Sequence, residues 1–386
     1  MSNVSKIEIQ DFSLWEKKAA QPRALYAFDL ELTARCNNNC RHCYINLPAN
    51  DQAAKAQELS LAEIEYIADQ AVELGAVWVL LTGGEPLLRP DFPEIDLMLK
   101  RKGLLVSVFT NATLVNQAHI DLFKRYPPRD IEVTIYGASQ ETYEAVTRLP
   151  GSFAAFQRGL QMLFDAGLRI RLKAMALRSN LHEIEAIAAF GRKYTKDYYR
   201  FDPVLHLRFD GDPQRNAEII GERLTPEEVV TLERRDPERF TGMEKNCNNL
   251  INSKYTHTSC NHLFHCGAGK DSFNIGYDGT FRLCSSLWAP ETTVNLRQVS
   301  LREAWENLVP AVRELSSDNQ RFLKTCRVCP LVNLCLWCPA HAYLEAGEMV
   351  AETPYFCQVA HARAAALQAA VQGAVQAKEQ PTKTDG

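Results

Sequence analysis

The chain has 386 residues, 46% of them hydrophobic, and a formal net charge of -4 at neutral pH. This composition excludes an unfolded chain and is sufficient for a barrel-sized domain with a smaller domain attached. Acidic and basic residues are interspersed, which argues against a nucleic-acid-binding face. No segment reaches the roughly 18 apolar residues of a membrane span, and the N-terminus has no apolar run typical of a signal peptide. We therefore expect a cytoplasmic protein without nucleic-acid or membrane partners.

Short β-rich runs alternate with amphipathic stretches between residues 25 and 210. This alternation predicts repeated βα units around a parallel sheet. Six units are too few for a closed eight-fold barrel, so we expect an α/β fold with an open, partial (βα)6 TIM-like barrel. Chemistry in such barrels lies at the C-terminal ends of the strands. The predicted strands span residues 25–33, 77–82, 104–110, 131–136, 170–176 and 201–207.

The helices between these strands carry their own boundary signals. Ser60 and Glu63 have the spacing of a capping box, which predicts a helix that begins there and ends before Gly75. Another helix is predicted to open after Asp91. Further helices are predicted over residues 116–125, 152–166, 181–194, 226–236 and 301–315.

The pattern changes after residue 210, where the chain becomes acidic and irregular, and from residue 247 it is cysteine-rich. Arg208, Asp210 and Asp212 lie at this boundary and are expected to be solvated loop charges. The polar end of the chain is expected to be disordered. We predict an N-terminal segment (1–24), a barrel (25–210), a linking region (211–246), a cysteine-rich domain (247–360) and a final helix with a polar tail (361–386).

Cys36, Cys40 and Cys43 directly follow the first predicted strand at C-x3-C-x2-C spacing. In a reducing compartment, thiols clustered in this way indicate metal ligation rather than disulfides. Three thiolates would leave one iron of a [4Fe-4S] cluster without a protein ligand and open to a small molecule. A zinc site with His42 as fourth ligand fits the same residues, so the spacing alone leaves both alternatives open.

This spacing after a first strand resembles the signature of the radical S-adenosylmethionine (SAM) superfamily. The run Gly83-Gly84-Glu85-Pro86 ends the second predicted strand and resembles the GGEP motif of that family. The resemblance implies that Cys36, Cys40 and Cys43 hold a catalytic [4Fe-4S] cluster and that SAM binds at the strand ends. The implied SAM contacts are Gly83, Gly84, Glu85, Pro86, Asn111, Thr134, His42 against the adenine and Arg148 toward the carboxylate.

Nine further cysteines lie in the second half of the chain. The pairs Cys326–Cys329 and Cys335–Cys338 have a spacing typical of zinc sites. Their wider order resembles instead the SPASM domain, which carries two auxiliary [4Fe-4S] clusters. The resemblance implies that Cys260, Cys266, Cys284 and Cys338 hold one cluster, and that Cys326, Cys329, Cys335 and Cys357 hold the other.

Two details accompany this cysteine pattern. Residues 276–279 read Gly-Tyr-Asp-Gly, which predicts a tight hairpin turn that brings Cys266 and Cys284 together. Cys247 belongs to neither set and is expected to be a buried or idle thiol.

The resemblance implies SAM and three [4Fe-4S] clusters as cofactors, and reductive cleavage of SAM to a 5'-deoxyadenosyl radical. SPASM-containing relatives suggest a peptide or protein substrate that receives a crosslink, such as a thioether, or is epimerised, as in the maturation of ribosomally made peptides. Formylglycine formation is disfavoured, because Ser285 stands where sulfatase-maturing relatives carry aspartate. The implied partner is a flavodoxin- or ferredoxin-type reductant. No leader-binding domain is expected before the barrel, so leader recognition would need either a separate leader-peptide-binding protein or the region between Asp210 and Lys245.

Three alternatives remain at this point. A small-molecule enzyme of the same superfamily, such as a tetrapyrrole side-chain decarboxylase or a dehydrogenase, would share these motifs. A zinc-binding interaction protein and a pure electron carrier would each use the cysteines without a SAM pocket.

Overall fold

The computed structural model describes residues 23–195, 199–251, 261–335 and 337–379, apart from the side chains of residues 248 and 371–379. Its centre is a nine-stranded sheet in the order β11-β10-β9-β1-β4-β5-β6-β7-β8. From β1 to β8 the neighbouring strands are all parallel. These strands are β1 (Ala27–Thr33), β4 (Trp78–Gly83), β5 (Leu105–Thr110), β6 (Asp130–Ile135), β7 (Ile170–Met175) and β8 (Arg200–Asp202). The six predicted strands and the α/β fold class are therefore confirmed.

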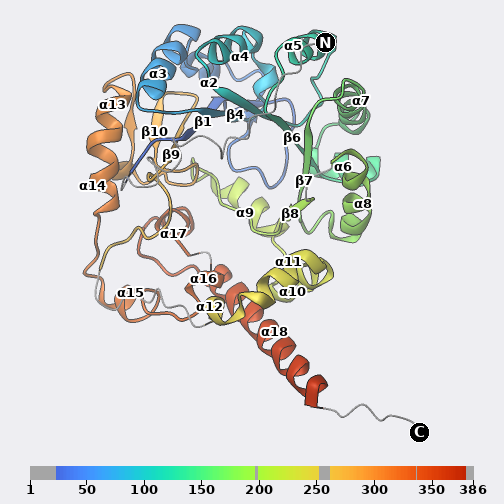
Figure 1. Cartoon of the computed structure of the whole chain (residues 1–386), viewed down its shortest axis with the longest axis vertical. Helices are drawn as coiled ribbons and strands as arrows, with labels where there is room; N and C mark the ends of the chain where they lie inside the picture. The colour runs from blue at the N-terminus through green and yellow to red at the C-terminus, as the bar shows by residue number, and fades with distance from the viewer. Residues whose placement is uncertain (1–22, 196–198, 252–260, 336, 380–386) are drawn as a thin grey trace, which may run out of the picture.

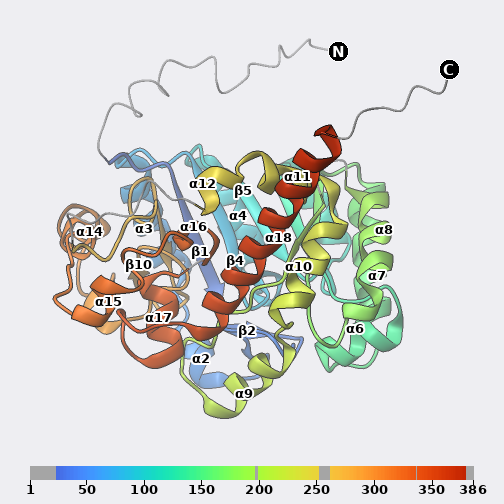
Figure 2. The same cartoon turned by 90° about the horizontal axis from the view of Figure 1, so that it is seen from below.

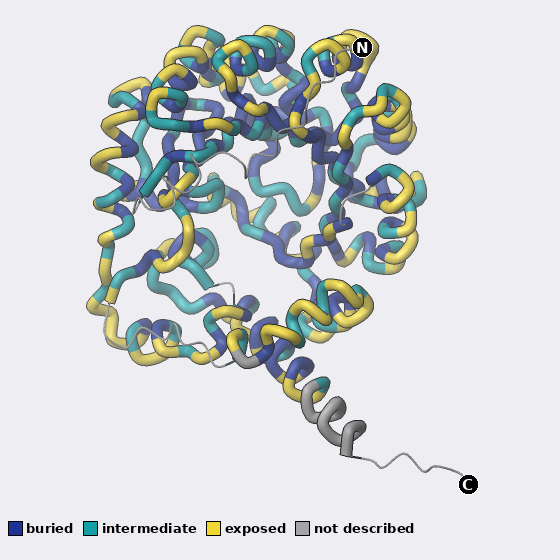
Figure 3. The backbone as a smooth tube through the Cα atoms, viewed as in Figure 1, coloured by how far each residue is buried: buried dark blue, intermediate teal, exposed yellow. Residues whose placement is uncertain are grey.

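Helices cover the outer face of this parallel sheet (Figure 1). Helix α3 begins with the predicted capping box, in which Ser60 Oγ accepts from the Glu63 N–H and Glu63 accepts from the Ser60 N–H. In Figure 3 the strands are mostly buried, whereas exposed residues recur along the outer helices. The barrel helices are α3 (Leu61–Glu73), α4 (Phe92–Arg101), α5 (Gln117–Arg125), α6 (Gln140–Thr147), α7 (Ser152–Asp165) and α8 (Ile184–Tyr194).

The stretch after the barrel is helical: the helix predicted over 226–236 is present, and the expectation that the rest is irregular is wrong. It forms α9 (Pro213–Glu222), α10 (Pro226–Arg235) and α11 (Pro237–Lys245). Each helix has proline at its first position and an Asp or Thr side chain that accepts from a backbone N–H of the first turn. Both residues are typical of helix N-termini, because proline lacks the N–H that would be unpaired there.

The C-terminal half extends the barrel sheet. Strands β9 (Ser272–Ile275) and β10 (Thr280–Arg282) form the predicted hairpin, with Gly279 at a φ of +86°. Strand β11 (Val294–Asn295) pairs antiparallel with β10 at the edge of the sheet. The sequence did not predict that β9 lies parallel beside β1. A fully buried ion pair of 2.8 Å between Glu31 of β1 and Arg282 of β10 fastens the hairpin to the barrel.

Short helices complete this half, and one long helix crosses it. The predicted helix at 301–315 is formed by α13 (Leu301–Glu303), a π-helical turn (Ala304–Leu308) and α14 (Val309–Arg313). The final helix α18 (Pro354–Glu379) begins earlier than expected and lies alongside α10 and α16 (Val332–Cys335), as Figure 2 shows. Most of the predicted disordered tail falls outside the described residues. No helix in the described part of the chain is long and apolar enough to cross a membrane.

Candidate functional site

The first cysteine group lies in a loop between two short strands. Cys36 ends β2 (Arg35–Cys36), which pairs with β3 (Leu47–Pro48) and so closes the loop that carries Cys40 and Cys43. The loop is fixed to the end of α6, because the N–H of Asn39 donates to the Thr147 carbonyl oxygen at 2.9 Å. Cys36 and Cys40 are buried, and burial raises the pKa of both thiols. A metal bound by these thiols would hold them as thiolates.

Two arginines that follow the last barrel strand in the sequence donate hydrogen bonds to the backbone of the same loop. The Arg208 guanidinium donates to the carbonyl oxygens of Cys43 and Asn46 at 3.4 and 3.2 Å, and Arg215 donates to that of Cys40 at 2.9 Å. Arg208 is only 3% exposed, so the expectation of a solvated charge is wrong for this residue. Its charge is balanced by Asp210, at 2.6 Å.

A cavity of about 380 Å³ opens from this loop into the barrel. Its walls join the cysteine loop to the C-terminal ends of β4, β5 and β6, where the sequence predicted the site. The predicted site residues that line it are Cys36, Cys40, His42, Cys43, Gly83, Gly84, Asn111 and Thr134, together with Tyr136.

Gly83 and Gly84 let β4 approach the cysteine loop. A Cβ atom on Gly83 would lie 2.2 Å from the Thr33 carbonyl oxygen, and one on Gly84 would lie 2.3 Å from that of Arg35. No side chain fits at such distances, and Gly83 also has a φ of +127°. The two glycines therefore bring the strand end and the cysteine loop together.

Glu85 and Pro86 are not among the residues that line this cavity. The fully buried Glu85 carboxylate accepts hydrogen bonds from the Thr110 hydroxyl and the Asn111 N–H, both at 2.7 Å. Burial raises the pKa of Glu85 to about 7. In this structure Glu85 joins the ends of β4 and β5 and so positions Asn111.

Unsatisfied polar atoms around the cavity are consistent with a polar ligand. His42 Nδ1 and the side-chain amide of Asn38 are buried without a hydrogen-bond partner among the described residues. Burial lowers the pKa of His42 to about 4, so the ring is neutral at physiological pH. It lies 5.2 Å from the Tyr136 ring. Because buried polar groups are normally paired, these atoms and the glycine-lined floor fit a ligand such as SAM.

A second cavity, of about 570 Å³, is lined by Cys266, Cys284 and Cys338. These are three of the four cysteines predicted for the first auxiliary cluster, and the fourth, Cys260, lies outside the described residues. Burial raises the pKa of Cys338 to about 12. Cys338 lines this cavity, whereas its sequence neighbours Cys329 and Cys335 line a different one.

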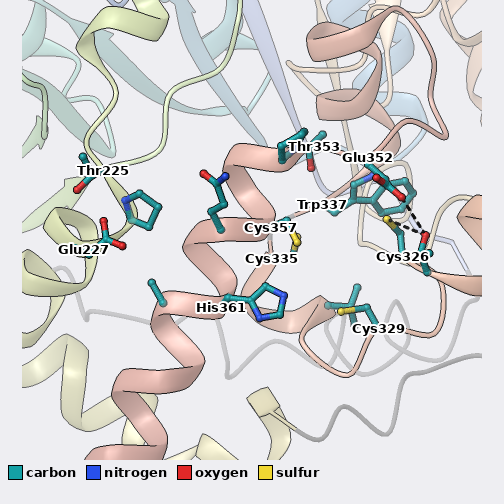
Figure 4. A pocket seen from close by; sticks show the side chains of 16 residues that line it. Thr225, Glu227, Cys326, Cys329, Cys335, Trp337, Glu352, Thr353, Cys357 and His361 are labelled. Atoms are coloured by element: carbon teal, nitrogen blue, oxygen red, sulfur yellow. Dashed lines mark hydrogen bonds between the residues drawn. The ribbon is translucent and has the colours of Figure 1, made fainter.

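A third cavity, of about 990 Å³, lies between α10 and α18 and is lined by Cys326, Cys329, Cys335 and Cys357 (Figure 4). Across the described ranges, no three His, Cys, Asp or Glu side chains form a set that could hold one metal ion. Each group of cysteines instead lines one of the three cavities described above. In a [4Fe-4S] cluster each thiolate binds a different iron.

Comparison with protein families agrees with this geometry. The family model described as the Radical SAM superfamily matches residues 30–191, which supply most of the residues that line the barrel cavity. Residues 30–191 form a radical SAM domain. The chain is therefore an enzyme, and this domain implies SAM and a [4Fe-4S] cluster as cofactors.

Two relatives cover most of this radical SAM chain. The AdoMet-dependent heme synthase of Methanosarcina barkeri is 28% identical over 335 residues, which are 84% of this chain and 94% of the relative. The antilisterial bacteriocin subtilosin biosynthesis protein AlbA of Bacillus subtilis is 26% identical over 330 residues, 82% of this chain and 67% of AlbA.

Solved structures show the same fold. Streptococcus suis SuiB bound to S-adenosylmethionine has a TM-score of 0.63 at 15% identity and covers 90% of this chain and 80% of that one. SuiB bound to its precursor peptide SuiA has a TM-score of 0.65 at the same identity and covers 90% and 78%.

Arg148, the predicted contact of the SAM carboxylate, does not line the barrel cavity of the radical SAM domain. It caps α6 in a left-handed conformation, with a φ of 52°, and pairs with Glu218 of α9 at 2.7 Å. Its Nε atom is buried without a hydrogen-bond partner among the described residues.

Some residues of the site could be recognised only from the structure. Arg215 and Asn38 had no signal in the sequence, because their roles depend on contacts across the fold. Cys247 is 8% exposed and packs in an apolar cluster with Leu331 and Leu334, as expected of a buried thiol.

Proposed function

We propose that this enzyme binds SAM at a [4Fe-4S] cluster held by Cys36, Cys40 and Cys43 and modifies a peptide or protein by hydrogen abstraction. When bound, the cluster and SAM supply a 5'-deoxyadenosyl radical through one-electron reductive cleavage. The observation that carries the proposal is the shared cavity: the three thiols face it together with Gly83, Gly84, Asn111 and Thr134.

The chain's own residues would orient SAM and protect the reaction. Asn111 and Thr134, at the ends of β5 and β6, offer hydrogen bonds, and the neutral His42 and Tyr136 rings offer flat surfaces for the adenine. The enclosing strands keep water away from a reactive radical. Arg148 remains the proposed carboxylate contact, with Glu85 and Pro86 as indirect supports.

The proposal includes a SPASM domain over residues 247–360, joined by the helical segment 211–246 to a barrel domain over 25–210. Its auxiliary clusters would be held by Cys260, Cys266, Cys284 and Cys338, and by Cys326, Cys329, Cys335 and Cys357. The two cysteine-lined cavities support this grouping. Fully ligated clusters act as electron conduits. The proposal further includes an external flavodoxin- or ferredoxin-type reductant and a cytoplasmic location, which suits unpaired thiols.

A peptide substrate is supported by the bacteriocin biosynthesis protein among the relatives and by the precursor peptide bound to SuiB. The modification would be a crosslink, such as a thioether, or an epimerisation. A tetrapyrrole substrate is the second candidate, because the heme synthase relative matches over 94% of its own length.

The test is formation of 5'-deoxyadenosine from SAM by the anaerobically purified, reduced protein, measured by chromatography. The wild type should produce it and Cys36→Ala should not. Cys247→Ala, which removes a thiol outside all three groups, is the matched control and should retain activity. A wild type that leaves SAM intact would refute the proposal.

A further inference from the structure

The barrel cavity and the cavity of Cys266, Cys284 and Cys338 meet. Five residues line both of them: Asp29, Asp202, Val204, His206 and Ser285. Because each of these residues belongs to both walls, the two spaces are neighbours across a single narrow region, which we term the junction. A substrate positioned between SAM and the first auxiliary site would lie at this junction.

Two carboxylates lie at the junction, one from the first and one from the last parallel strand of the barrel. Asp29 comes from β1, where Phe28 and Leu30 are 1% exposed and pack in the core. Because strand residues alternate in direction, Asp29 faces the cavity side of the sheet. Asp202 ends β8, the last parallel strand.

These two carboxylates differ from the other charged groups of the barrel cavity, which are neutralised by partners. Glu31 pairs with Arg282 at 2.8 Å, and Lys173 pairs with Glu132. Within the described ranges, by contrast, the Asp29 carboxylate has no hydrogen bond or ion pair. Asp202 accepts one hydrogen bond, from the Val204 N–H at 3.0 Å.

His206 adds an independent sign of a ligand. Its Nδ1 atom is buried at the junction and has no hydrogen-bond partner in the described part of the protein. A buried, unpaired ring nitrogen is costly unless another molecule completes its hydrogen bond. Burial and the neighbouring Glu31 raise the pKa of Asp29 to about 6, so its carboxylate is mostly charged at physiological pH.

We propose that Asp29, Asp202 and His206 form the substrate subsite of this enzyme and that the subsite binds a hydrogen-bond-donating group of a peptide, such as a lysine side chain. The inference rests on the proposed function and narrows its substrate class. Ionised carboxylates only accept hydrogen bonds, whereas an ammonium group donates three. A tetrapyrrole carboxylate placed here would be repelled by two like charges in a partly desolvated space.

The test uses the full chain with its clusters intact and SAM bound, under anaerobic conditions. Three probes are used. The first is an acetylated, amidated pentapeptide with a central lysine, the second is the same peptide with glutamate in place of the lysine, and the third is coproporphyrin III. Their affinities are measured by equilibrium dialysis. The wild type should bind the lysine peptide about tenfold or more tightly than the glutamate peptide. The double variant Asp29→Asn/Asp202→Asn should lose this preference.

The matched control is Asp121→Asn/Asp165→Asn, which removes two exposed carboxylates and should keep the preference. A melting temperature and a cluster absorbance equal to those of the wild type show that both double variants are folded. If the junction double variant unfolds, the single variants Asp29→Asn and Asp202→Asn are measured in its place. Equal or undetectable binding of the two peptides by the wild type, a preference that survives in the junction variant, or tighter binding of coproporphyrin III overturns the subsite. If the subsite is overturned but the wild type still cleaves SAM, the proposed function is unaffected.

Discussion

The barrel cavity and the outer pocket of Cys326, Cys329, Cys335 and Cys357 are built in opposite ways. The barrel cavity takes its residues from the ends of neighbouring strands, whose spacing the sheet fixes. The outer pocket takes its cysteines from loops, from the end of the four-residue α16 and from the first turn of the long helix α18. Its shape depends on pairs between distant segments. The comparison indicates that the sheet fixes most of the barrel cavity, whereas the outer pocket depends on a few long-range contacts.

The largest expected effect is on the outer pocket. Glu233 of α10 is 1% exposed and accepts hydrogen bonds from Arg363 of α18 at 2.7 and 2.9 Å. Glu233→Gln leaves the Arg363 charge buried without its anion, and removal of one partner of a buried pair costs about 3–5 kcal/mol. We expect this loss in the free energy of unfolding measured with denaturant, together with loss of iron from the outer pocket.

Glu306→Gln is the control, because it breaks the exposed pair with Arg302. Exposed pairs contribute about 0–1 kcal/mol, so this variant should unfold like the wild type. Equal stability of the two variants would show that the Glu233–Arg363 pair does not support the pocket.

The next effect is on the barrel cavity. Gly84→Ala places a Cβ atom 2.3 Å from the Arg35 carbonyl oxygen, on backbone that cannot yield without moving the cysteine loop. Overpacking of this kind costs about 1–3 kcal/mol. We expect a matching loss of thermal stability and a larger loss of SAM cleavage, because the strand end and the loop separate.

Gly242→Ala provides the control for this substitution. A Cβ atom at Gly242 in α11 meets nothing within 4 Å, and alanine is the better helix former. This variant should be as stable as the wild type or more so. If Gly84→Ala behaves in the same way, close backbone approach is not what builds the site.

The smallest effect is on an ion pair between a barrel helix and the C-terminal half of the chain. Glu63 of α3 pairs with Arg297, which follows β11 (Val294–Asn295), at 2.6 Å. The Arg297 hydrogen bond lowers the pKa of Glu63 to about 2, below its ordinary value of 4.5. A lowered carboxyl pKa contributes stability above pH 4.5 that is lost as the pH falls toward 2.

Because both side chains are about one-third exposed, the contribution is expected to stay below about 1 kcal/mol. Glu63→Gln should therefore lower the melting temperature slightly at pH 7 and less at pH 3. A difference that grows as the pH falls would contradict this assignment.

The same contrast explains what the sequence could predict. The six barrel strands, the Ser60 capping box and the cysteine loop depend on neighbours in the chain, and all appeared where the local pattern predicted them. Helices α9 and α11 also have local signals, the Asp-Pro pairs at 212–213 and 236–237.

Other features depend on contacts that no local pattern contains. The parallel pairing of β9 with β1 joins residues at opposite ends of the sequence, such as Ala27 and Ser272. The burial of Arg208 follows from its bonds to the loop of Cys43. Asp29 belongs to a strand predicted correctly, yet only the fold shows that it faces Cys284 across a shared cavity.

We propose that three separate thiol groups, the barrel group among them, each hold one cluster. Iron and acid-labile sulfide, measured per chain after anaerobic purification, are the deciding quantities. We expect about twelve irons for the wild type and about eight for the variant with Cys36, Cys40 and Cys43 all changed to alanine. Zinc without sulfide in the wild type, or an iron content unchanged in that variant, would contradict it.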